Sequence, residues 1–116
     1  MDGFFAAAGI GDAHRVPMHF VIEEWFTNLV KYSRGGSPEI LLELERDGDL
    51  LRLSLSESGV APFDIRTMPD VDVDRDIRDR KPGGLGIHLL RKMVDDIRYE
   101  YTDGHSTTTF VKALER

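Results

Sequence analysis

Cysteine is absent from this sequence of 116 residues, and its absence excludes several classes of protein. Without thiols the chain cannot be a disulfide-stapled scaffold, bind a metal through thiolates or use a cysteine nucleophile. The absence is compatible with a reducing compartment, and we expect a cytoplasmic protein. No run of about 18 apolar residues occurs, so we expect no membrane-spanning helix. The first residues also lack the basic region of a signal peptide.

Positive charge is scarce, since 15 Lys and Arg residues face 21 Asp and Glu residues and the formal net charge is −6. Proteins that bind nucleic acids usually present a basic face, so this charge disfavours direct contact with nucleic acid. Hydrophobic residues make up 41% and charged residues 31% of the chain, which is typical of a globular protein. Because the length fits one domain, we expect residues 1–116 to form a single domain.

The N-terminal part of the sequence predicts two helices. Residues 4–8 predict a short helix that ends at the glycines 9 and 11. Apolar residues then recur at helical spacing from Asp12 to residue 33, which predicts a long helix that includes Trp25 in its buried face. The helix-breaking residues 34–38 end it.

The remaining sequence predicts two hairpins and a third helix. Residues 40–55 and 97–112 each alternate apolar with other side chains around a central Asp-Gly pair, which predicts two β-hairpins. Residues 83–97 predict an apolar helix that begins at a glycine cluster and runs into the second hairpin. This order predicts an α+β fold, with helices on one face of an antiparallel sheet of four strands.

The first candidate for chemistry is the pair Glu24 and Asn28 on the long helix. Residues four positions apart share a helix face, so the carboxylate and the carboxamide project into the same space. A carboxamide oxygen can bind Mg²⁺ beside phosphate oxygens, and a carboxylate can accept a proton. Two polar residues on a solvated helix face are the structural alternative.

The second candidate is Glu57, at the end of a predicted strand and two residues before Gly59. A carboxylate at this place could accept a hydrogen bond from the amino group of an adenine, and a nearby glycine lets the backbone approach the base. A solvated strand end followed by a turn is the structural alternative.

The third candidate is the glycine cluster at positions 83, 84 and 86, where a helix begins. Backbone N–H groups at a helix N-terminus attract phosphates, although glycines can also serve only a tight turn into the helix. The preceding residues 57–82 contain Gly, Pro, Asp and Arg with little periodicity, and a loop of this length in a compact domain is usually functional.

Taken in order, these segments resemble the ATP site of the GHKL ATPase superfamily, and in particular the anti-sigma-factor serine/threonine kinases of the RsbW type. The resemblance covers nearly the whole chain. It is carried by residues 22–32, 62–64, 82–95 and 99–104. It implies a Bergerat-type sandwich without the family's usual first strand and part of its first helix. Family dimers use that region, so a homodimer stays open.

The resemblance also implies roles for single residues. Glu24 corresponds to the general base and Asn28 to the magnesium ligand. Residues 60–82 correspond to the ATP lid, with Arg80 and Lys81 available to the γ-phosphate. The residues that the resemblance places around the nucleotide are Asn28, Lys31, Glu57, Gly59, Arg80, Lys81, Gly83, Gly84, Leu85, Gly86 and Thr108. Glu57 is a departure, because the family normally has Asp there.

The implied function is an ATP- and Mg²⁺-dependent serine protein kinase that also acts as an anti-sigma factor. Its implied partners are a sigma factor and a STAS-domain anti-anti-sigma protein, in bacterial partner switching. A nucleotide-binding or degenerate interaction module that binds its partner without kinase activity is the alternative. A detached histidine-kinase ATPase domain is disfavoured, because histidine kinases commonly have Asn at the position of Glu24.

Overall fold

The computed structural model describes residues 2–32, 39–67 and 84–114. The breaker residues 34–38 and most of the predicted lid lie outside these ranges. The elements are α1 (Asp2–Ala7), α2 (Asp12–Tyr32), β1 (Leu41–Asp47), β2 (Leu50–Glu57), the 3-10 helix η1 (Ile65–Thr67), α3 (Gly84–Met93), β3 (Asp96–Thr102) and β4 (His105–Ala113).

The four strands form one antiparallel sheet in the order β1-β2-β4-β3. Each predicted hairpin is present, and β2 and β4 join the two hairpins in the centre of the sheet. Gly48 and Gly104 have positive φ angles of 61° and 79° in the two turns, a conformation that glycine adopts without strain. The predicted α+β fold is therefore confirmed.

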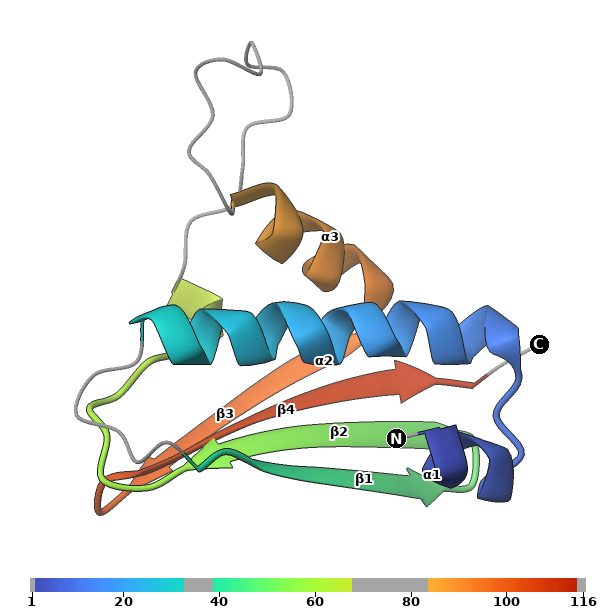
Figure 1. Cartoon of the computed structure of the whole chain (residues 1–116), viewed down its shortest axis with the longest axis horizontal. Helices are drawn as coiled ribbons and strands as arrows, with labels where there is room; N and C mark the ends of the chain where they lie inside the picture. Colours follow the sequence, from blue (N-terminus) through green and yellow to red (C-terminus); the bar gives the residue numbers. More distant parts are fainter. Residues whose placement is uncertain (1, 33–38, 68–83, 115–116) are drawn as a thin grey trace, which may run out of the picture.

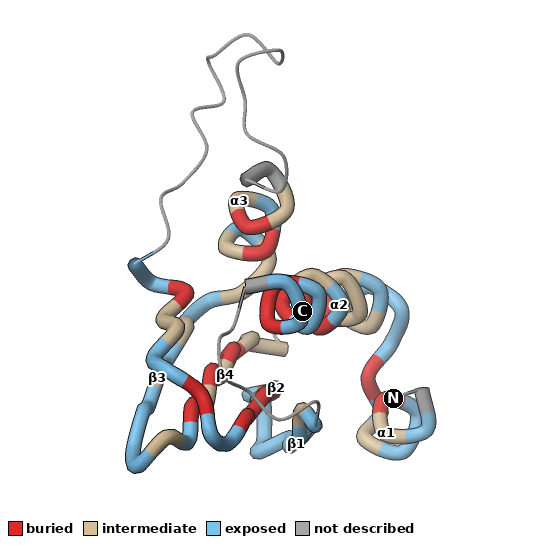
Figure 2. Tube along the Cα trace, turned by 60° about the vertical axis from the view of Figure 1, so that its left-hand side comes forward, coloured by how far each residue is buried: buried red, intermediate tan, exposed pale blue. Residues whose placement is uncertain are grey.

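Helices α2 and α3 lie on the same face of the sheet (Figure 1). The buried residues of the sheet lie mainly on its central strands β2 and β4 (Figure 2). On β2, Leu51, Leu53 and Leu55 are buried, as their alternation predicts. Trp25 of α2 is fully buried and stacks on Phe63 with a ring separation of 5.3 Å. In the described ranges, no helix is long and apolar enough to cross a membrane.

The end of α3 differs from the prediction. The apolar spacing extended the helix to Ile97, whereas α3 ends at Met93 and Ile97 lies in β3. Two hydrogen bonds from Asp95 to β4 explain the early end: its backbone N–H donates to the Val111 carbonyl (2.9 Å), and its side-chain carboxylate accepts from the Ala113 N–H (2.7 Å). Pairing with β4 thus replaces a further helical turn.

Candidate functional site

Three segments that carry the predicted site residues lie toward one side of the molecule. Figure 1 shows the C-terminal end of α2, the end of β2 and the start of α3 on the same side. These segments are distant in the sequence, and α3 packs against α2. The fold therefore brings the first and third candidates together, with the second toward the same side of the molecule.

Glu24 and Asn28 form a direct pair on α2. The Asn28 side-chain Nδ2 donates to the backbone carbonyl of Glu24 (2.8 Å) and to its carboxylate oxygen Oε2 (2.9 Å). Asn28 is buried and Glu24 is half-buried, so this is not the solvated helix face of the alternative interpretation. Because both amide hydrogens are used within the helix, the carbonyl oxygen Oδ1 is the group that Asn28 can offer to a ligand.

Gly86 lies directly against the Glu24 carboxylate. A Cβ atom at position 86 would lie 2.5 Å from Cδ, Oε1 and Oε2 of Glu24, which is too close for a real contact. Only glycine leaves the space that this rotamer of Glu24 occupies. The first turn of α3 is thus in contact with the candidate base on α2, a juxtaposition that the sequence pattern did not predict.

Glu57 ends β2 in a buried polar patch. Its side chain is 5% exposed, and among the described residues its Oε1 has no hydrogen-bond partner. Ser106 lies opposite Glu57 in the β2–β4 register, and Thr108 lies on the same face two residues along β4. Both are buried as well. A buried carboxylate oxygen without a donor is costly, so this patch is suited to accept a hydrogen bond from a ligand.

The backbone conformation at position 59 favours glycine, whether or not a nucleotide binds there. Its φ angle is 72°, and its backbone packs beside Gly104 of the β3–β4 turn. The next N–H, of Val60, donates to the Gly104 carbonyl (3.1 Å), and the Tyr101 hydroxyl donates to the Val60 carbonyl (2.6 Å). Gly59 thus fixes the path of the chain just after Glu57.

Tyr99 makes two contacts beside the site that the sequence reasoning did not assign to it. Its hydroxyl accepts from the Phe63 N–H (2.9 Å) and from the Ser106 hydroxyl (3.0 Å). It therefore ties the segment after β2 to β3, beside the polar patch of Glu57. In the sequence of β3 the tyrosines alternate with other residues, which indicates that they share one face of the strand. The sequence does not identify the groups to which their hydroxyls bind.

Asp64 and Arg66 form an ion pair next to Tyr99. The Arg66 Nη2 lies 2.7 Å from Asp64 Oδ2, and its guanidinium lies 5.9 Å from the centre of the Tyr99 ring. The hydrogen bond from the Arg66 side chain lowers the pKa of Asp64 below its ordinary value, and the same bond raises the pKa of Arg66.

The other predicted site residues are only partly described. Lys31 is exposed in the last turn of α2, while Gly84 begins α3 and is followed by Leu85. Arg80, Lys81 and Gly83 lie outside the described residues, as does the predicted lid beyond residue 67. In the described part of the chain, no group of three or more His, Asp or Glu side chains could hold a metal ion.

The family follows from a comparison with family models. The model described as the histidine kinase-like ATPase domain matches residues 3–112. The chain belongs to this family. The match spans α2, the sheet and α3, and so includes all three segments of the candidate site.

Two curated relatives carry the name serine-protein kinase RsbW. The protein of Listeria monocytogenes (strain EGD-e) is 29% identical over 112 residues, which are 91% of this chain and 71% of that protein. The protein of Listeria innocua is 28% identical over the same shares of both chains. The resemblance to RsbW-type kinases, inferred from the motifs, is confirmed by these relatives.

One solved structure shows the fold alone. The Acinetobacter baumannii histidine kinase AdeS superposes on 88% of this chain with a TM-score of 0.56 and 15% identity. This chain spans 48% of that structure, about half of its length. The arrangement of helices over the sheet is therefore that of a histidine kinase-like ATPase domain, while the roles of single residues stay predictions.

Proposed function

We propose that this chain is an ATP-dependent protein serine kinase in which Glu24 is the general base. The observation that carries the proposal is the Glu24–Asn28 pair, held against Gly86 at the start of α3. The family supports ATP as the phosphoryl donor, and the relatives named serine-protein kinase support serine as the acceptor.

Asn28 fits the role of magnesium ligand. Its two amide hydrogens are bound to Glu24, which leaves Oδ1, a neutral oxygen of the kind that Mg²⁺ accepts beside phosphate oxygens. Mg²⁺ held there would supply positive charge that neutralises the phosphates. The backbone N–H groups of the first turn of α3 would bind the phosphates, with Gly83, Gly84, Leu85 and Gly86 lining them.

Glu24 would accept the proton from the hydroxyl of the incoming serine. The bond from Asn28 and the contact with Gly86 both hold its carboxylate in one place, which is what a positioned base requires. Lys31 lies one turn beyond Asn28 and would add positive charge near the phosphates. Arg80 and Lys81 would do so from the lid.

Glu57 would bind the adenine, together with Thr108 and the backbone at Gly59. The support is the buried Oε1, which has no donor among the described residues and could accept from the amino group of the base. Glu57 also supports the second candidate function, a module that binds nucleotide or partner without kinase activity. Its side chain is one methylene longer than the Asp that the family normally has.

We further propose the biological setting that the resemblance to anti-sigma-factor kinases of the RsbW type implies. In it the chain binds a sigma factor in the cytoplasm and phosphorylates a serine of a STAS-domain anti-anti-sigma protein. Residues 60–82 would form the lid, and different contacts of this segment with ATP and with ADP would give the partners different affinities in the two states.

Incubation with radiolabelled ATP, Mg²⁺ and a STAS-domain protein encoded nearby tests the proposal. We expect label on a serine of the STAS protein, and loss of both transfer and Mg²⁺-dependent nucleotide binding in Asn28→Ala. Nucleotide binding without transfer would favour the interaction module. No nucleotide binding by calorimetry would contradict the kinase proposal and would leave only a module that binds its partner without nucleotide.

A further inference from the structure

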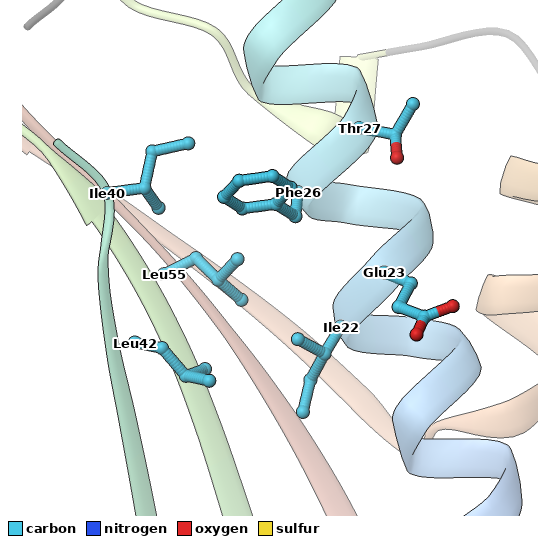
Figure 3. A pocket seen from close by; sticks show the side chains of 7 residues that line it. All are labelled: Ile22, Glu23, Phe26, Thr27, Ile40, Leu42 and Leu55. Carbon is cyan, nitrogen blue, oxygen red and sulfur yellow. The ribbon is translucent and has the colours of Figure 1, made fainter. Parts of the chain in front are cut away.

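Helix α2, which carries the candidate base, is anchored on the sheet. Figure 3 shows Ile22 and Phe26 of α2 facing sheet residues across an apolar pocket, and Ile22 is buried. Trp25 is fully buried, and its ring centre lies 6.4 Å from that of Phe110 on β4. Because α2 is fixed in this way, the fit between the Glu24 carboxylate and the first turn of α3 depends on what holds α3.

The residues around η1 are packed into the fold, although they begin the predicted lid. We call residues 63–67 the η1 segment. Within it, Ile65 is fully buried, and Phe63 stacks on Trp25 with ring centres 5.3 Å apart. The Phe63 N–H also donates to the Tyr99 hydroxyl (2.9 Å). The η1 segment is therefore bound both to α2 and to the sheet.

Arg91 ties α3 to the η1 segment. Its Nη2 donates to the Ile65 backbone carbonyl (2.9 Å), and its side chain is half-buried. Arg91 lies about one and a half helical turns after Gly86. Because an α-helix is hydrogen-bonded along its length, a bond that fixes Arg91 also restricts where Gly86 can lie.

These contacts close a ring around the candidate base. Glu24 precedes Trp25 in α2, and Trp25 stacks on Phe63. The η1 segment bonds to Arg91, and α3 leads back from Arg91 to Gly86. A Cβ atom at position 86 would lie 2.5 Å from the Glu24 carboxylate, so the ring closes on a tight contact. A small shift of α3 would therefore change the position of this carboxylate.

We infer that Arg91 is a positioning residue, which acts through the η1 segment to hold the first turn of α3 against Glu24. Without its bond to the segment, α3 could move relative to α2, and the Glu24 carboxylate would no longer be held in one place. The consequence for catalysis rests on the proposed function, because it takes Glu24 as the base. The geometric part holds for the protein without nucleotide and can be tested alone.

Two side chains with unique NMR signals report on the ring. Asn28 is the only asparagine and the sequence has no glutamine, so the carboxamide that donates to Glu24 gives the only side-chain amide signals of this kind. Trp25 is the only tryptophan, so its indole N–H reports on the stack with Phe63. In the nucleotide-free protein, we expect Arg91→Met to shift both sets of signals.

Matched variants separate this bond from a general loss of charge. Lys92→Met makes a similar change at the next position of α3, where the side chain is exposed, and should shift neither set of signals. Arg91→Lys keeps a donor and should give a smaller shift than Arg91→Met. Phe63→Leu removes the stack at the other end of the η1 segment and should also shift the Asn28 carboxamide signals. It supplies the test if Arg91→Met does not fold.

Phosphoryl transfer to a STAS-domain protein reads the catalytic consequence. We expect Arg91→Met to lower kcat about tenfold while KM for Mg²⁺-ATP changes less than about threefold, because a misplaced base slows transfer without weakening nucleotide binding. Arg91→Lys should recover part of the rate, and Lys92→Met should match wild type. If Arg91 acts through Gly86, the effects are not additive: the double variant Arg91→Met, Gly86→Ala should be within about twofold of Gly86→Ala alone.

Unchanged Asn28 signals in both Arg91→Met and Phe63→Leu would overturn the inference, as would equal shifts in Arg91→Met and Lys92→Met. Shifted signals with an unchanged kcat would contradict the role in catalysis, and fully additive effects of Arg91→Met and Gly86→Ala would contradict the route through Gly86. If the wild-type protein transfers no phosphate, the kinase proposal fails, while the NMR comparison still decides whether Arg91 positions Glu24.

Discussion

At the scale of single residues, the contact between Gly86 and Glu24 makes a sharp prediction. In Gly86→Ala the added methyl group would lie 2.5 Å from the carboxylate and must displace it. A displacement of about 1 Å can cost about a hundredfold in rate, so we expect a loss of phosphoryl transfer on that order, measured with a STAS-domain substrate. Gly3→Ala, where the methyl group meets nothing within 4 Å, is the control. Equal rates in the two variants would show that the contact does not position the base.

Glu57 gives a second prediction at this scale. Glu57→Ala should weaken ATP binding about tenfold or more, because a hydrogen bond to a charged group contributes on the order of 1.5–3 kcal/mol. Glu57→Asp should keep or tighten binding, since it restores the shorter carboxylate of the family. Calorimetry on variants with unchanged melting temperatures makes the comparison. If Ala and Glu bind ATP equally tightly, Glu57 does not contact the nucleotide.

The Asp64–Arg66 pair predicts a pH dependence of stability. The pKa of Asp64 is lowered from its ordinary 3.8 by the Arg66 hydrogen bond, so the pair stabilises the fold above that value. The stabilisation is lost as the pH falls through the lowered pKa. The difference in unfolding free energy between wild type and Asp64→Asn should therefore be constant near neutral pH and shrink below 3.8. A difference that grows on acidification would contradict the assignment.

At the scale of elements, Tyr99 links the segment after β2 to β3. Tyr99→Phe removes the acceptor of the Phe63 N–H, so we expect a loss of about 1 kcal/mol in unfolding free energy. Hydrogen exchange at Phe63 should become about fivefold faster. Tyr101→Phe also removes one hydroxyl but leaves this bond in place, and serves as the control. Unchanged exchange at Phe63 in Tyr99→Phe would contradict the anchoring role.

Elements were predictable where one local pattern determined them. Both hairpins follow from alternation around an Asp-Gly turn, and α2 follows from the spacing of residues such as Phe20, Trp25 and Leu29. The end of α3 was not predictable, because Ile97 fits the helical spacing as well as the strand. The pairing of Asp95 with β4, a contact between distant residues, decides between them.

At the scale of the whole molecule, the candidate site depends on contacts between elements. The four-residue spacing predicted that Glu24 and Asn28 share a face, and their hydrogen bond confirms that they do. The spacing could not show that Gly86 touches the carboxylate or that Glu57 is buried without a donor. The contact of Gly86 depends on the packing of α3 on α2, and the burial of Glu57 depends on the pairing of β2 with β4.

The central claim is that Glu24 accepts a proton during transfer to serine, and the variant Glu24→Gln tests it most directly. Gln keeps the shape and can still accept from Asn28, but it cannot take up the proton. We predict that transfer to the STAS-domain protein falls by about a hundredfold or more while the affinity for Mg²⁺-ATP stays within a few-fold. Glu100→Gln, an exposed change of the same kind on β3, should match wild type. A Glu24→Gln variant that phosphorylates as fast as wild type would contradict the account.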